Sequence, residues 1–310
     1  MKIVFMGNPA IANPILNTIH KSSHEVIGVV SNAPKPMGRG RILRHTAVGE
    51  LAHELKLNFI PVESLIDQGF HDKLRSLYPD IFIIVAFRIL PKSVLEIPKI
   101  GSVNLHTSLL PKYRGAAPIQ HAILNGDKET GITTFLIEPK VDTGAVLLQK
   151  RIIIQDDDDC GTLTEKMAKN GTDLVLRTLD QLEKGSFEPI PQNNELATTA
   201  PKITREMCQI DWSGPAQNIH NQVRALSPYP GAFSSINGKR LKIFKSKVLY
   251  QNNMDTHGYI SLLEKTRIAI SCGEGQLEIL EIQIEGKRRM TMAECLMGMR
   301  VKTGDTIGDQ

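Results

Sequence analysis

Several features that would place a protein in a special class are missing from this sequence. Its four cysteines form no C-x-x-C pair, and no charged segment followed by an apolar one opens the chain. The longest apolar runs, such as IFIIVAF at 81–87, are far shorter than the ~20 residues that span a bilayer. We therefore expect a reduced, cytoplasmic protein without a membrane segment.

The motifs of dinucleotide and metal binding are also absent. The first apolar run leads into GNPAIA at 7–12, which has one glycine where a G-x-G-x-x-G motif needs three. His106 is followed by no second histidine or cysteine at the spacing of a zinc site. The acidic run at 156–159 lacks the spacing of a calcium loop, so we interpret it as a solvated turn beside a helix N-terminus. We expect no metal.

The composition is that of an ordinary globular protein. At 310 residues the chain exceeds the size at which one hydrophobic core stops growing, so two domains are expected. Hydrophobic residues make up 41% and charged residues 23%, which excludes a wholly disordered chain. The net charge of +4 is compatible with an anionic partner such as RNA, although a solvated surface explains it equally well.

The first half of the chain alternates short apolar runs with helical spacing. Runs such as KIVFMG, EVIGVV and DIFIIVAF are apolar on both faces, which is typical of a buried, mostly parallel sheet flanked by helices. We predict a Rossmann-like α/β domain over residues 1–188. A helix is expected after Gly161, with Thr162 and Glu165 as its capping box. Further expected elements are a helix at 118–125 and strands at 132–137 and 146–154.

A second domain is expected after a linker. The chain near 189–207 is rich in Pro, Asn, Glu and Thr and has no apolar periodicity, which is typical of a linker. Residues 208–310 then show one helical pattern and several short strand-like runs with glycine-containing turns. We predict a small β-barrel similar to an OB fold, a class that often binds oligonucleotides.

Three polar residues in the segment 101–147 suggest chemistry. Asn104 and His106 lie two positions apart at the end of a predicted strand, so their side chains point to the same face. Asp142 comes from a separate loop, VDTG. An amine that attacks an amide-like carbonyl builds negative charge on oxygen, which hydrogen-bond donors must stabilise, while a carboxylate helps to move the proton. Singly each residue is more often structural, but together they predict one site for acyl transfer.

A family resemblance supports this interpretation. NLHTSLLPKYRGAAPIQ, followed by TGITTFLIEPKVDTG, resembles the signature of the folate-dependent formyltransferases, and SLLPKYRGAAPIQ resembles their methionyl-tRNA branch. The likeness covers nearly the whole chain, including 35–48, 85–98 and 210–226. It implies that a monomer transfers the formyl group of 10-formyltetrahydrofolate to methionyl-initiator tRNA, and that the barrel-like domain binds the tRNA.

The same resemblance implies residue roles. Asn104 and His106 match the residues that stabilise the oxyanion, and Asp142 matches the residue that serves proton transfer. Expected folate contacts are Ser108, Leu109, Leu110 and Pro111 in one loop and Phe87, Arg88 and Leu90 in another. The second loop is one residue shorter than the pattern commoner in the methionyl-tRNA branch and resembles the purine-pathway relatives.

Contacts with tRNA are expected in the segment KPMGRGRIL. It matches the loop that enters the acceptor end of the tRNA, so Arg39 and Arg41 are the predicted phosphate contacts. A solvated basic loop is the alternative interpretation.

Two other functions remain as alternatives. A sugar-amine N-formyltransferase shares the Asn, His and Asp residues, but GAAPIQ and GRGRIL fit the tRNA branch better. An RNA-binding module with a relic site would suit the barrel-like domain, but the intact triplet argues against it. A ribonucleotide acceptor is disfavoured because Pro9 removes an N–H donor from the turn that would hold its phosphate.

Overall fold

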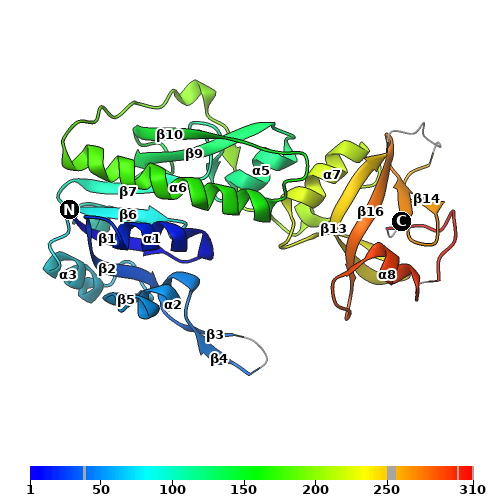
Figure 1. Ribbon diagram of the computed structural model, residues 1–310, viewed down its shortest axis with the longest axis horizontal. Helices are drawn as coiled ribbons and strands as arrows, with labels where there is room; N and C mark the ends of the chain where they lie inside the picture. The colour runs from blue at the N-terminus through cyan, green and yellow to red at the C-terminus, as the bar shows by residue number, and fades with distance from the viewer. Residues whose placement is uncertain (38–39, 250–255, 299, 309–310) are drawn as a thin grey trace. The chain divides into compact units, whose positions relative to one another are not determined.

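The computed structural model describes residues 1–37, 40–249, 256–298 and 300–308, which form two compact units (Figure 1). The first unit comprises Met1–Ala116, Thr130–Ile153 and Thr164–Ala200, and the second comprises Ala117–Glu129, Ile154–Leu163 and Pro201–Gln310. The predicted linker at 189–207 is divided between them, because its residues up to Ala200 belong to the first unit.

The first unit is built on a seven-stranded sheet of order β10-β9-β7-β6-β1-β2-β5. Its strands are β1 (Lys2–Gly7), β2 (Glu25–Asn32), β5 (Phe59–Val62), β6 (Ile81–Val85), β7 (Gly101–His106), β9 (Glu129–Leu136) and β10 (Val146–Ile153). The pairs β1–β2, β1–β6, β2–β5 and β6–β7 are parallel, and β7–β9 is antiparallel. The prediction of a Rossmann-like, mostly parallel sheet is confirmed.

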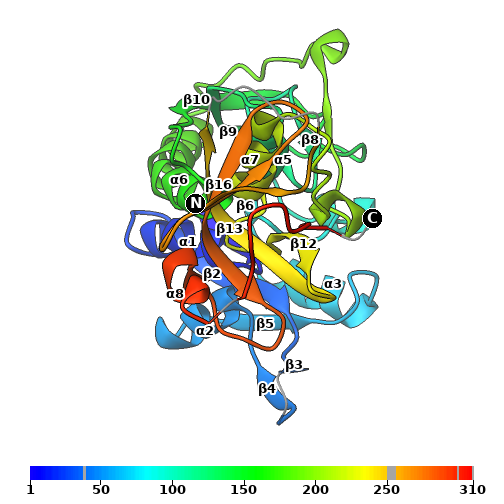
Figure 2. The same ribbon diagram turned by 90° about the vertical axis from the view of Figure 1, so that its right-hand side faces the viewer.

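Helices flank this sheet. They are α1 (Asn13–His20), α2 (Ala47–Glu54), α3 (Gln68–Ser76), α4 (Lys92–Leu95) and α6 (Cys160–Glu183), with short 3-10 turns η1 (Ala10–Ala12) and η2 (Asn194–Leu196). Figures 1 and 2 both show α1 and α6 side by side. A side chain at Gly171 of α6 would meet Leu105 of β7 and Ile15 of α1, so Leu105 points toward this helical layer. Its neighbours in β7 therefore point to the opposite face.

Burial on both faces makes the sheet a rigid support. Successive side chains of β1 point to opposite faces of the sheet, so Ile3 and Phe5 lie on one face and Val4 and Met6 on the other. All four are fully buried. Each such side chain contributes roughly 1.5–3 kcal/mol through removal of apolar surface from water. The strand ends that carry polar residues are thus held in fixed positions.

Small two-stranded elements complete the unit. They are the hairpin of β3 (Lys35–Met37) and β4 (Ile42–Arg44), and the parallel pair of β8 (Arg114–Gly115) and β11 (Thr199–Ala200). The pair β8–β11 joins residues far apart in the chain, and it ties the end of the first unit to the loop that follows β7.

The start of α6 differs from the prediction. The helix begins at Cys160, and the Asp159 carboxylate accepts a hydrogen bond of 2.9 Å from the backbone N–H of Thr162, which lies inside the helix. Asp158 is buried and accepts a hydrogen bond of 2.9 Å from the Thr162 hydroxyl. The predicted capping box of Thr162 and Glu165 is wrong because Asp159, directly before the helix, caps it instead.

The second unit contains a six-stranded antiparallel sheet, part of which is visible in Figure 2. Its strands run in the order β12-β13-β16-β15-β14, with β17 paired to β16. They are β12 (Ala232–Ile236), β13 (Lys239–Leu249), β14 (Ile260–Leu263), β15 (Ile268–Ser271), β16 (Gln276–Ile284) and β17 (Met290–Thr291). The unit also contains α5 (Pro118–Leu124), η3 (Glu206–Cys208), α7 (Ala216–Ala225) and α8 (Met292–Leu296). The prediction of a second, β-rich domain is confirmed.

The cysteines are buried in the described structure. All four are free, and burial raises the pKa of the Cys272 thiol to about 12, so this sulfur stays protonated. None of the described helices combines the length and the apolar character needed to cross a membrane. Within the described ranges, no three His, Cys, Asp or Glu side chains are grouped in a way that suits a metal ion.

Candidate active site

The predicted catalytic residues lie at the carboxyl edge of the first unit's sheet. Strands β6 and β7 are parallel neighbours in which Ile84 faces Asn104, and β7 ends at His106. The strand order reverses around β1, with β2 and β5 on one side and β6 and β7 on the other. Ligand sites of open α/β sheets form at this edge, next to such a reversal.

His106 is buried, and its two ring nitrogens have different surroundings. Its Nε2 lies 2.9 Å from the carbonyl oxygen of Tyr113, and because a carbonyl only accepts, Nε2 must carry the hydrogen. Its Nδ1 lies 3.8 Å from the Asp142 carboxylate. Burial lowers the pKa of His106, while the charge of Asp142 and the Tyr113 carbonyl partly oppose this shift. The imidazole is therefore neutral near pH 7, with a lone pair on Nδ1.

Asp142 is held in an unusual backbone conformation. Its φ of 53° lies in the left-handed region, and its Oδ2 accepts a hydrogen bond of 2.8 Å from the backbone N–H of Gly115. A Cβ at Gly144 would lie 1.6 Å from the backbone oxygen of Leu136, so only glycine fits there. The VDTG motif thus forms a tightly specified loop that brings the carboxylate to His106.

Asn104 has an available donor. Its side chain is only partly buried, and it makes no hydrogen bond to another residue that the structure describes. Strand alternation puts it on the same face as His106, because Leu105 between them points toward α6. The structure therefore places Asn104, His106 and Asp142 at one edge of the sheet.

The first predicted folate loop is held by Thr133 of β9. The Thr133 hydroxyl donates to the Ser108 carbonyl (2.6 Å) and accepts from the Leu110 N–H (3.2 Å). Ser108 and Leu110 are buried, whereas Leu109 and Pro111 are partly exposed. A ligand beside this loop would therefore meet mainly the apolar surface of Leu109 and Pro111.

The second predicted folate loop is anchored by Arg88. Its guanidinium donates to the carbonyl oxygens of Glu63 (2.8 Å) and Val62 (3.3 Å), and it lies 5.5 Å from the centre of the Phe87 ring. Leu90 is part of the hydrophobic core. The structure thus shows Arg88 joining its loop to the end of β5 and leaves Phe87 partly exposed.

Arg41, one of the two predicted tRNA contacts, lies next to β4 in the β3–β4 hairpin. Arg39 lies outside the described residues. Arg41 is exposed and has a φ of 48°, and it is followed by Ile42 and Leu43, which are 64% and 67% exposed. Two large apolar side chains left in water beside an arginine suit a surface that contacts a partner.

Two residues that contact the Asp142 loop could not be identified from the sequence, Gly115 and Gln192. Gly115 donates to the carboxylate, and a Cβ at this position would lie 2.6 Å from the Ala200 oxygen, so glycine is required. Gln192, from the predicted linker, donates to the Asp142 and Gly144 carbonyls. The glycine in KYRGAAP was a signal for a close backbone approach. Nothing in the composition around Gln192 distinguished it from a solvated side chain.

Comparisons with known proteins identify the family of this chain. The family model described as formyl transferase matches residues 1–179, and the model described as formyl transferase, C-terminal domain, matches residues 202–300. The methionyl-tRNA formyltransferase of Caldanaerobacter subterraneus subsp. tengcongensis is 42% identical over 309 residues, which cover 99% of this chain and 100% of that protein.

Solved structures share the fold. The sugar 3N-formyl transferase WlaRD, crystallised in the presence of dTDP and 5-N-formyl-THF, matches with a TM-score of 0.68 at 23% identity and covers 93% of this chain and 99% of that chain. The methionyl-tRNA formyltransferase from Clostridium thermocellum matches with a TM-score of 0.59 at 16% identity and covers 92% and 98% of the two chains. Because two family models and a full-length relative agree, the chain belongs to the formyl transferase family and, within it, to the methionyl-tRNA formyltransferases.

Proposed function

We propose that this protein transfers the formyl group of 10-formyltetrahydrofolate to the free amino group of methionyl-initiator tRNA. The observation that carries the proposal is the match at 42% identity to a methionyl-tRNA formyltransferase along the whole of both chains. Identity at this level to a methionyl-tRNA formyltransferase over the full length of both chains favours the tRNA substrate over the sugar-amine alternative.

His106 is proposed to move the proton. The attacking amine must lose a proton as its nitrogen bonds to the formyl carbon, and neutral His106 offers the lone pair on Nδ1. The imidazolium that forms is stabilised by Asp142, whose Oδ2 lies 3.8 Å from Nδ1. The same Nδ1–H then donates its proton to the folate nitrogen that leaves the formyl carbon. The proton balance is complete, because the hydrogen of the amine ends on the folate.

Asn104 is proposed to stabilise the oxygen of the formyl group. Negative charge develops there during attack, and the amide N–H groups of Asn104 have no competing partner among the described residues. The protonated Nδ1 of His106 is a second donor in the same region. Such preorganised donors are usually the largest single contribution to acyl transfer.

The formyl donor is proposed to lie against the two loops at the sheet edge. The partly exposed side chains of Leu109, Pro111 and Phe87 offer it apolar and aromatic surface. The hydrogen bonds between Thr133 and the loop containing Ser108, together with the anchoring of Arg88, keep that surface fixed. A preformed apolar wall beside a few polar groups is the usual composition of a small-molecule site.

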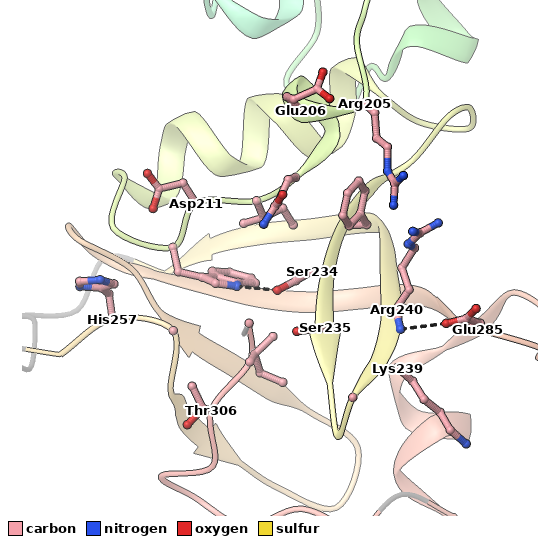
Figure 3. A pocket seen from close by; sticks show the side chains of 18 residues that line it. Arg205, Glu206, Asp211, Ser234, Ser235, Lys239, Arg240, His257, Glu285 and Thr306 are labelled. Atoms are coloured by element: carbon pink, nitrogen blue, oxygen red, sulfur yellow. Dashed lines mark hydrogen bonds between the residues drawn. The ribbon is translucent and has the colours of Figure 1, made fainter. Parts of the chain in front are cut away.

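The second unit is proposed to bind the tRNA. Its described residues surround an open pocket of about 790 Å³ whose lining includes Arg205, Lys239 and Arg240. Figure 3 shows the guanidinium groups of Arg205 and Arg240 pointing toward one another. Two like charges in this arrangement repel each other, and a phosphate between them would remove that repulsion.

Acidic residues also line this pocket, and they limit where a phosphate would bind. Glu206, Asp211 and Glu285 balance the three basic residues in number. The Arg240 guanidinium packs 5.0 Å from the centre of the Phe233 ring, a geometry that keeps its outer face available. We therefore place the phosphate contact between Arg205 and Arg240.

The decisive experiment is a formylation assay with purified protein, 10-formyltetrahydrofolate and methionyl-initiator tRNA. We expect formylmethionyl-tRNA as the product. Absence of this product would refute the proposal, and formylation of an amino-sugar nucleotide in its place would establish the alternative.

In the same assay, replacing Arg205 and Arg240 by Ala should raise KM for tRNA and reduce the slope of log affinity against log salt by about 1–2. An unchanged slope would exclude this pocket from tRNA binding.

A further inference from the structure

We infer that Gln192 is a positioning residue, which holds the catalytic Asp142 loop in place through its side-chain amide and through Arg114. The inference rests on the proposed function, because it gives Gln192 a role in formyl transfer by way of Asp142. Gln192 lies in the segment 190–200, here called the strap, which the sequence predicted as part of a linker.

The amide nitrogen of Gln192 holds the backbone of the loop. Nε2 donates one hydrogen bond of 3.0 Å to the carbonyl oxygen of Asp142 and another of 2.7 Å to that of Gly144. Both N–H groups of the side chain are therefore used, one on each side of Thr143. The loop is bound at the residue that carries the carboxylate and at the glycine that permits its turn.

The amide oxygen of Gln192 faces a cation. Oε1 accepts hydrogen bonds from Nε (3.1 Å) and Nη2 (2.7 Å) of Arg114. This arrangement fixes the orientation of the amide, because a flipped side chain would place NH₂ against the guanidinium and oxygen against two carbonyls. Gln192 thus joins the guanidinium of Arg114 to two backbone carbonyls. A carboxylate could only accept and an ammonium could only donate, so neither could replace the amide.

Strand β8 reaches Asp142 by two routes. The backbone N–H of Gly115 donates to Oδ2 of the carboxylate (2.8 Å), and the side chain of Arg114 acts through Gln192 on the backbone of Asp142. The two adjacent residues of β8 therefore hold different parts of Asp142: Gly115 holds its carboxylate, and Arg114 holds its backbone carbonyl through Gln192. The distance of 3.8 Å between Oδ2 and His106 Nδ1 depends on both connections.

The strap is itself fixed on either side of Gln192. Ile190 pairs with Val146 of β10, and Thr199 pairs with Arg114 of β8. The Thr198 hydroxyl accepts a hydrogen bond of 2.9 Å from the backbone N–H of Tyr113. The segment that carries Gln192 therefore makes specific contacts both before and after this residue. A segment that served only as a linker would not need these contacts.

The Asp142 loop depends on external support. Asp142 occupies the left-handed region, which is unfavourable for a residue with a side chain, and the preceding residues 138–141 are exposed. Without Gln192, the two carbonyls would turn to water and the carboxylate would gain freedom. Misplacement of a reacting group by about 1 Å can cost ~10²-fold in rate.

Replacing Gln192 by Ala tests the inference. We expect kcat to fall ~10- to 100-fold while KM for both substrates stays within about twofold. Gln192→Glu keeps the size and the acceptor for Arg114 but removes both donors, so it should lose at least as much. The matched control is Asn193→Ala, which removes a hydrogen bond within the strap (to the Glu195 N–H) that touches neither Asp142 nor Arg114, and its kcat should match the wild type.

A readout independent of activity separates positioning from general damage. The charge of Asp142 raises the pKa of His106, so a loosened carboxylate should move the NMR titration of His106 to lower pH in Gln192→Ala, with thermal unfolding showing an intact fold. An unmoved titration in the folded variant would contradict the inference. This measurement needs no substrate, so it remains decisive even if the wild-type protein fails to formylate tRNA and the proposed function is lost.

A double-mutant cycle completes the test. If Gln192 acts through Asp142, the variant with both Asp142→Asn and Gln192→Ala should be hardly slower than Asp142→Asn alone. Full additivity of the two losses in kcat, or a wild-type kcat for folded Gln192→Ala, would overturn the inference while leaving the proposed function untouched.

Discussion

The Asp142 loop and the β3–β4 hairpin are both irregular parts of the first unit, yet they are built in opposite ways. The Asp142 loop is bound by Gly115 and Gln192, which come from distant parts of the chain, and it contains a glycine that no other residue can replace. In the hairpin, the side chains at 41–44 are all exposed. One loop is held by the rest of the unit, and the other presents its side chains to the surroundings.

This difference separates two tasks of an enzyme with a large substrate. A group that meets a developing charge must be in place before the reaction, because movement during the step adds to the barrier. A surface that contacts a macromolecule gains from exposed cationic and apolar side chains. Substitutions in the first loop should therefore change kcat, and substitutions in the second should change KM.

The largest effect is expected from Asp142→Asn. The shape of the side chain is kept, but the charge that stabilises protonated His106 is lost. We expect kcat to fall by ~10³ with little change in KM for either substrate, as measured by steady-state kinetics. A fall in kcat of less than tenfold would show that the carboxylate is only structural.

A smaller loss is expected from Asn104→Ala, which removes a proposed donor to the formyl oxygen. We expect kcat to fall on the order of 10² with folate affinity nearly intact. The affinity is measured by fluorescence titration with the folate, and single-turnover rates give the chemical step. Turnover near that of the wild type would remove Asn104 from the mechanism.

The hairpin should show the contrasting behaviour. Replacing Arg39 and Arg41 by Ala is expected to raise KM for tRNA by about tenfold at unchanged kcat, because phosphate contacts contribute to docking rather than to chemistry. Arg177→Ala is a suitable control, since this arginine of α6 is exposed and pairs with Asp173. A loss confined to kcat would contradict the division between the two loops.

The pH dependence of kcat should report on His106 and on the Asp142 loop beside it. Because burial lowers the pKa of His106, the neutral form persists below pH 6.5, and the rate should begin to fall only at more acidic pH. Since the charge of Asp142 raises this pKa, the acidic limb of the kcat profile should move to still lower pH in Asp142→Asn. A limb that moves upward would show that another group controls the rate.

The smallest effect is expected for the stability of the hairpin. Leu43 is 67% exposed, so Leu43→Ser should change the free energy of unfolding by no more than about 0.5 kcal/mol. Leu110, in the loop that follows β7, is 4% exposed, and Leu110→Ala should cost roughly 2–5 kcal/mol. Chemical denaturation of both variants measures the contrast, and equal losses would mean that the hairpin is packed in solution.

The fold and the common face of Asn104 and His106 were predictable because their signals are local. Buried strands such as β6 have continuous apolar runs, and the two-residue spacing of Asn104 and His106 fixes their common face. The start of α6 was wrongly predicted because Asp159 and Thr162 both suit a cap, and only the backbone path shows which of them precedes the helix.

What supports the site was not predictable from one sequence. Gln192 bonds to residues about fifty and eighty positions away in the chain, and its own neighbours carry no periodic pattern. Likewise, the presence of Arg88 in its loop does not reveal that its guanidinium bonds to the end of β5. Contacts between distant irregular segments depend on the assembled fold, which local patterns do not specify.

The last residues of the first unit, Thr199 and Ala200, form β11, which pairs with β8. The structure of the first unit is therefore complete only when these residues are present. During synthesis, the strand with His106 and the loop with Asp142 leave the ribosome before Thr199 and Ala200 do. A nascent chain therefore carries the proposed catalytic side chains for some time before the segment that orders them has emerged. For the same reason, an excised first unit intended for study by itself would have to extend to Ala200 rather than stop at the end of α6.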